Sequence, residues 1–92
     1  MIFEIKKKQV FVSDSGNVYD SKKKTIILLH GSGLTHIVWS LTEQYLINQG
    51  YNVFSIDLPG HGSSNGPSLK TIEEMATWLN ALTDEIGVKK FT

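Results

Sequence analysis

Two short apolar runs limit the possible folds of this 92-residue chain more than any other feature. Residues 25–29 and 51–56 are rich in Ile, Leu, Val and Phe and contain few polar side chains. Nearly continuous apolar runs of this length are typical of strands buried on both faces of a parallel sheet. A glycine-containing loop and a helical pattern follow each run. The sequence therefore predicts parallel strands joined by helices through right-handed crossovers.

Both helical patterns carry signals for their ends. The first helix is expected over 41–49, with a Ser-x-x-Glu capping box at 40–43 and Gly50 just past its end. The second begins at a Thr-x-x-Glu box at 71–74 and ends at Gly87. Its expected buried stripe repeats at helical spacing. The stripe comprises Ile72, Met75, Ala76, Leu79, Leu82 and Ile86.

The two ends of the chain complete the expected fold. Residues 2–5 and 9–12 alternate in polarity and are expected to form a hairpin, and residues 88–92 are expected to begin a further strand. The fold class is therefore α/β, with an N-terminal hairpin followed by a parallel β-α-β-α-β unit. We treat residues 1–92 as one segment of a single domain.

Composition excludes several classes of function. The chain has no cysteine, so it offers no disulfide and no thiolate zinc site, and its three scattered histidines do not suggest a metal site. Nine lysines balance nine acids and arginine is absent, which disfavours nucleic-acid binding. No apolar run is long enough for a membrane span and no signal peptide is evident, so we expect no membrane partner and a cytoplasmic location. We interpret the two lysine triplets as solvated hairpin ends rather than an anionic-partner surface.

Two nucleotide-binding interpretations of the glycine-containing loops are disfavoured. Gly31 and Gly33 begin a G-x-G-x-x-G pattern that lacks its last glycine, and Asp57 lies 26 residues after Gly31 instead of about 20. Residues 57–60 match the D-x-x-G of nucleotide-triphosphate switches. That match has no G-x-x-x-x-G-K-[ST] upstream to hold phosphate and magnesium.

A third interpretation accounts for both loops. Residues 28–33 read LLHGSG, Trp39 follows, and residues 53–64 read VFSIDLPGHGSS. Together these segments resemble the α/β-hydrolase superfamily. The first is similar to its oxyanion loop after strand 3, and the second to its D-x-[PR]-G-x-G-x-S segment after strand 4. The resemblance extends over essentially the whole chain and implies a partial α/β-hydrolase sheet.

The first loop is the candidate site. Glycines at positions 31 and 33 let the backbone turn sharply and let a substrate approach main-chain N–H groups, which an oxyanion requires as donors. By resemblance, the donor is the N–H of Ser32, with that of Gly33 as second choice, and His30 and Gly31 support the loop. Ser32 is not expected to be the nucleophile, because the family's serine lies in a G-x-S-x-G elbow that this sequence lacks.

The remaining polar and aromatic candidates receive structural roles. By resemblance, Asp57 and His61 hold the loop after the second buried run and are not an acid–base pair. His36 is expected in a loop near the mouth of a pocket. Trp39 and Trp78 are expected to pack in the core, and no cofactor is expected.

The resemblance implies a serine hydrolase acting on a small acyl substrate through an acyl-enzyme. The family's nucleophile, acid and histidine all follow strand 5, so this chain alone is expected to be inactive. The alternative is a non-catalytic α/β-hydrolase-like unit that binds or assembles. In either case an apolar parallel strand remains at a sheet edge, which predicts self-association or a complementing C-terminal chain.

Overall fold

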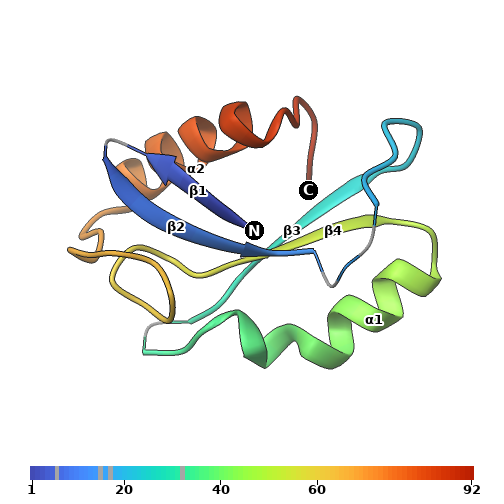
Figure 1. The fold of residues 1–92 in the computed structure, drawn as a ribbon, viewed down its shortest axis with the longest axis horizontal. Coiled ribbons are helices and arrows are strands. Elements are labelled where there is room, and N and C mark those ends of the chain that lie inside the picture. The colour runs from blue at the N-terminus through green and yellow to red at the C-terminus, as the bar shows by residue number, and fades with distance from the viewer. Residues whose placement is uncertain (6, 15, 17, 32) are drawn as a thin grey trace.

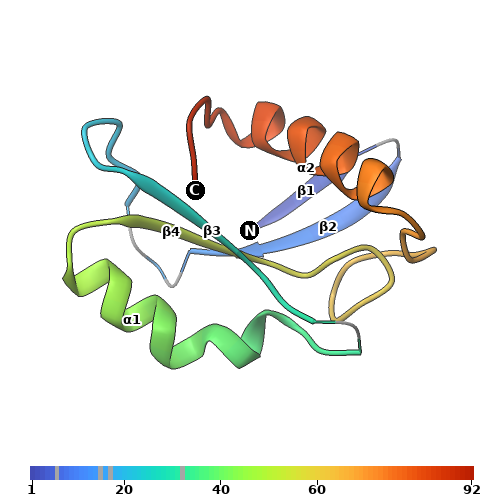
Figure 2. The same ribbon diagram turned by 180° about the vertical axis from the view of Figure 1, so that it is seen from behind.

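The computed structural model describes residues 1–5, 7–14, 16, 18–31 and 33–92. A four-stranded sheet in the order β1-β2-β4-β3 forms the centre, with α1 and α2 on opposite sides of it (Figures 1 and 2). The elements in chain order are β1 (Ile2–Ile5), β2 (Lys8–Ser13), β3 (Thr25–Leu29), the 3-10 helix η1 (His36–Trp39), α1 (Ser40–Asn48), β4 (Asn52–Ile56) and α2 (Ile72–Ile86).

The pairing of the strands confirms the predicted fold class. The hairpin strands β1 and β2 are antiparallel, and β2 runs antiparallel to β4. Strand β3 pairs with β4 in parallel, from Thr25 opposite Asn52 to Leu29 opposite Ile56. The connection between them runs through α1, so the two apolar runs form the expected β-α-β unit.

The core lies between the sheet and α2. Every residue of β4 is buried, as expected, including the polar Asn52 and Ser55. The core combines residues of the hairpin, β4, α2 and the segment after α2; its buried members are Ile5, Val10, Val12, Phe54, Ile56, Leu82 and Val88. The predicted α2 stripe is correct at Leu82, but Ile72, the first residue of the helix, is 77% exposed and Ala76 is exposed as well.

The expected strand over 88–92 is formed only at its last residue. The N–H of Thr92 donates to the carbonyl of Thr25, and the N–H of Ile27 donates to the carbonyl of Thr92, both at 2.9 Å. Thr92 therefore occupies the position of a parallel neighbour of β3. The residues before it are not in strand conformation, and Val88 is instead buried in the core.

The N-cap at Thr71 is confirmed, although Glu74 accepts from the N–H of Lys70 instead of that of Thr71, and the capping box at 40–43 is wrong. The Thr71 hydroxyl accepts from the N–H of Glu74 at 3.0 Å, and α2 ends at Gly87 in the left-handed conformation, as predicted. Ser40 is not a cap. Because η1 precedes it, its hydroxyl donates to the carbonyl of Ile37, while the Glu43 side chain is buried and accepts from the Ser13 hydroxyl at 3.3 Å.

The described part of the chain offers neither a membrane span nor a metal site. No helix there is both long and apolar enough to cross a membrane. Among the same residues, no group of three or more His, Asp and Glu side chains is placed to hold a metal ion.

Candidate functional site at the carboxyl edge of the parallel strands

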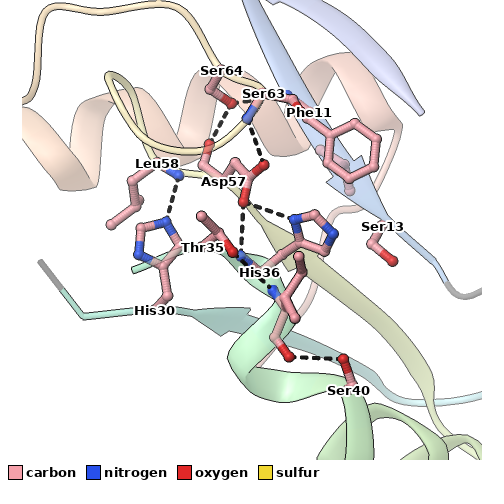
Figure 3. A network of polar contacts seen from close by, with 12 residues as sticks. Phe11, Ser13, His30, Thr35, His36, Ser40, Asp57, Leu58, Ser63 and Ser64 are labelled. Atoms are coloured by element: carbon pink, nitrogen blue, oxygen red, sulfur yellow. Dashed lines mark hydrogen bonds and ion pairs between the residues drawn. The ribbon is translucent and has the colours of Figure 1, made fainter. Parts of the chain in front are cut away.

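The candidate site lies where β3 and β4 end. Because the two strands are parallel, the loops that follow them meet at one edge of the sheet, where open α/β sheets bind ligands. His30 and Gly31 come directly after β3, and Asp57 comes directly after β4. Figure 3 shows the polar contacts between these loops.

Asp57 is the centre of this edge and is 0% exposed. One carboxylate oxygen, Oδ1, accepts from the backbone N–H of His36 at 2.7 Å and lies 2.8 Å from the Nδ1 atom of the same residue (Figure 3). The other, Oδ2, accepts from the N–H of Ser63 at 2.9 Å. The carboxylate therefore connects the start of η1 to the loop after β4.

These contacts set the charge state of Asp57. Burial disfavours the carboxylate and by itself raises the pKa of Asp57. The backbone N–H groups of Ser63 and His36, together with the His36 imidazole, favour the charged form and outweigh burial. The pKa of Asp57 consequently lies below its ordinary value of 3.8, so Asp57 is ionised at neutral pH.

This shift predicts a dependence of stability on acid. A carboxyl with a lowered folded-state pKa stabilises the fold above its unfolded pKa and loses that contribution as pH falls through its folded pKa. We expect the free energy of unfolding to fall below about pH 4, where unfolded chains take up the proton first. Urea unfolding of the native chain and of Asp57→Asn between neutral and acid pH tests this. The difference in free energy of unfolding between the native chain and Asp57→Asn should become smaller on acidification. A difference that stays constant contradicts the expectation.

His30 makes a second connection between the loops. Its Nε2 accepts from the N–H of Leu58 at 3.0 Å, so Nδ1 carries the proton and donates to the carbonyl of Gly31 at 2.7 Å. Both ring nitrogens are thus engaged, and the side chain is buried. The His61 ring lies against that of His30, with 5.0 Å between centroids.

Two contributors to this edge were not anticipated from the sequence in these roles. His36, expected in a loop near a pocket mouth, is the first residue of η1; it contacts the buried carboxylate, and its side chain is 21% exposed. Ser64 donates its hydroxyl to the carbonyl of Asp57 at 2.6 Å and accepts from the N–H of Phe11 at 2.9 Å, which ties the loop to β2. The His36 pairing has no local sequence signal, whereas Ser64 occupies the serine of the D-x-[PR]-G-x-G-x-S pattern.

The predicted oxyanion donors are only partly covered by the described residues. Ser32, the first-choice donor, lies outside them. Gly33 has a φ of 79°, and no atom lies within 4 Å of where a Cβ would stand. The N–H of Leu34 donates to the carbonyl of Gly31 at 3.1 Å and closes the turn. The donor roles of residues 32 and 33 therefore stay predictions.

Comparison with known proteins agrees with this geometry. A model of the Alpha/beta hydrolase family matches residues 26–90. The pimeloyl-[acyl-carrier protein] methyl ester esterase of Cronobacter sakazakii is 35% identical over 63 residues, which are 68% of this chain and 24% of the esterase. The enzyme of the same name from Sodalis glossinidius is 42% identical over 53 residues, 58% of this chain and 20% of that enzyme. The chain thus spans about a quarter of the length of these relatives.

Solved structures share the fold at lower sequence identity. A predicted CIB-like hydrolase from Thermoplasma acidophilum superposes with a TM-score of 0.86 at 23% identity, covering 100% of this chain and 47% of that one. Epoxide hydrolase A from Mycobacterium thermoresistibile gives a TM-score of 0.82 at 22% identity, covering 100% and 29%. Since the family match covers more than two thirds of its residues, the chain belongs to the alpha/beta hydrolase family.

Proposed function

We propose that this chain supplies the N-terminal part of a serine hydrolase that cleaves small carboxylic esters through an acyl-enzyme. The observation that carries the proposal is the double connection between the two loops at the carboxyl edge. Asp57 accepts from the N–H of residue 36 and His30 accepts from the N–H of residue 58, so residues 30 and 36, on either side of the 31–34 segment, are both tied to the loop after β4. The similarity of this chain to a methyl ester esterase supports the choice of an ester substrate.

The proposed chemistry assigns this chain the charge-stabilising half of the reaction. When a nucleophilic hydroxyl attacks an ester carbonyl, an electron pair moves onto the carbonyl oxygen, which then needs fixed N–H donors. We assign that donation to the N–H of Ser32, with Gly33 as the second choice. His30 and Gly31 support the turn. His30 is not the catalytic base, because its acceptor nitrogen already receives the N–H of Leu58.

The proposal includes a complementing C-terminal part or a second copy. Four of the five residues of β3 are only partly buried, although all four are apolar. The outer face of η1 and α1 exposes an apolar stripe at helical spacing, with Leu41 88% exposed. The stripe comprises Ile37, Val38, Leu41 and Tyr45, and the exposed Leu34 precedes it in the turn before η1. Exposed apolar surface of this kind is typical of an interaction face.

A hybrid enzyme tests the function. Residues 1–92 replace the corresponding segment of the Cronobacter sakazakii esterase, which provides the rest of a hydrolase domain. We expect the folded hybrid to hydrolyse p-nitrophenyl acetate and to react with a fluorophosphonate probe. The 92-residue chain alone should do neither. A folded hybrid without turnover would contradict the hydrolase proposal, and labelling of a serine in the chain alone would contradict the assigned half-site.

A backbone substitution tests the donor itself. Replacing Ser32 by its α-hydroxy acid turns the N–H into an ester oxygen, and this should lower kcat of the hybrid about a hundredfold, the effect of losing one oxyanion donor. Ser32→Ala keeps the N–H and is the matched control, with kcat expected within about twofold of the hybrid. If the backbone ester at residue 32 and the equivalent one at residue 33 both leave kcat unchanged, the oxyanion assignment is wrong.

A further inference from the structure

Five of the nine lysines of this chain surround one hollow. They come from two segments 65 residues apart in the sequence, and all five are exposed. The hollow has a volume of about 670 Å³ and is also lined by the aromatic rings of Tyr19 and Phe91. Its lysines, called the lysine ring below, are Lys22, Lys23, Lys24, Lys89 and Lys90.

The fold itself brings the lysine ring together. Lys24 immediately precedes Thr25, the first residue of β3, and Lys90 lies two residues before Thr92. Backbone hydrogen bonds join Thr92 to Thr25 and Ile27 in parallel pairing. Because the segments that precede parallel neighbours lie at the same edge of a sheet, the two lysine runs meet at the amino edge of β3.

No lysine of the ring is paired with an acidic side chain within the described chain. No acidic side chain lines the hollow. Among the residues that the structure describes, the one ion pair within 4.0 Å joins His36 and Asp57, so it includes none of these lysines. Asp20 is on the same linker and its carboxylate accepts from the backbone N–H of Lys22 at 2.9 Å, but it forms no ion pair within 4.0 Å with a lysine of the ring. A chain of zero net charge thus concentrates positive charge at one place.

We propose that this hollow binds a small molecule that carries two or more linked phosphate groups. Five like charges repel one another, and a ligand with one negative charge would leave most of that repulsion in place. Lysine binds phosphate as a compact point charge, and the volume of the hollow falls within the usual range for small-molecule sites. This inference replaces the expectation that the lysines of residues 22–24 are merely solvated.

The proposed phosphate site is separate from the candidate oxyanion loop. The hollow is at the amino end of β3 and the loop at its carboxyl end, with the five residues of the strand between them, a length of about 16 Å. The lysine ring therefore cannot contact a reacting ester at the opposite edge. The proposal stands or fails independently of the hydrolase function.

Isothermal titration calorimetry of the 92-residue chain with inorganic tripolyphosphate tests the site. We expect one-to-one binding that is at least tenfold tighter than binding of orthophosphate and that weakens as salt rises from about 20 to about 200 mM, because exposed charges are screened. Replacing one lysine from each segment, Lys23→Gln with Lys89→Gln, should weaken binding at least tenfold. The matched control, Lys8→Gln with Lys70→Gln, removes two lysines that line a different hollow and should change affinity less than twofold.

Three results would overturn the proposal. Equal weakening by both double variants would mean that tripolyphosphate responds only to net charge. Equal affinity for tripolyphosphate and orthophosphate would mean that the lysines do not act together. Binding to phosphatidylserine vesicles without binding to tripolyphosphate would assign the lysine ring to a membrane surface instead.

Discussion

Asp57→Ala is expected to lower the free energy of unfolding by about 4 kcal/mol, because it removes a fully buried acceptor that is shared by three donor groups. The carboxylate receives two backbone N–H groups, those of His36 and Ser63, and also contacts the His36 imidazole. Each buried donor left unpaired costs about 1–3 kcal/mol. The loss is larger than for a surface carboxylate because water does not reach Asp57 in the folded chain.

Urea unfolding followed by far-ultraviolet circular dichroism measures this loss. Asp84→Ala is the control, since Asp84 is an exposed carboxylate on α2 and its replacement should change stability by less than about 0.5 kcal/mol. Asp57→Asn keeps an oxygen acceptor and should recover part of the stability. A loss below about 1 kcal/mol for Asp57→Ala would show that the loops are held by other contacts.

The sheet was predictable from the sequence because its signals are local. Residues 25–29 form β3 as expected, and the expected strand over 51–56 begins one residue later, at Asn52. Short apolar runs of this kind, bounded by turn residues and rich in β-branched or aromatic side chains, favour buried strands. The glycine at 87 similarly marks the end of α2, because the left-handed conformation with a φ of 91° favours glycine.

The predictions that failed concern segments whose structure is set by contacts between residues far apart in the sequence. The capping box at 40–43 has the right residue types, but η1 places Ser40 inside the helical run and the hydroxyl of Ser13 draws Glu43 inward. The strand over 88–92 was expected from its residue types alone, whereas the structure buries Val88 in the core and pairs only Thr92 with β3. The local sequence pattern predicts whether a segment is a helix or a strand, but tertiary packing decides where that helix or strand begins and ends.

The candidate site was predictable in location but not in its contacts. Parallel strands ending in glycine-containing loops identify the carboxyl edge without coordinates. The pairing of His36 with Asp57 bridges 21 residues and depends on the direction in which η1 leaves the turn. The lysine ring likewise requires the pairing of Thr92 with β3, which no spacing in the sequence specifies.

Gly62→Ala should destabilise the fold by about 3–4 kcal/mol, through two separate costs. Gly62 has a φ of 49°, and a Cβ at this position would lie 2.4 Å from Oδ2 and 2.6 Å from Cγ of Asp57. The methyl group must therefore displace the Asp57 carboxylate from the N–H groups that donate hydrogen bonds to it. Left-handed backbone strain adds about 1–2 kcal/mol for a residue with a side chain.

Gly50→Ala separates the two costs of Gly62→Ala. Gly50 has a φ of 93° and no atom within 4 Å of its would-be Cβ, so its replacement by alanine introduces strain without a clash and should cost about 1–2 kcal/mol. In the background of Asp57→Ala, Gly62→Ala should lower the free energy of unfolding by no more than Gly50→Ala does, because the carboxylate that would clash with the new methyl group is absent. Equal losses for Gly62→Ala and Gly50→Ala in the native background would contradict the clash. Purely additive effects of Gly62→Ala and Asp57→Ala would show that Gly62 does not act through the carboxylate.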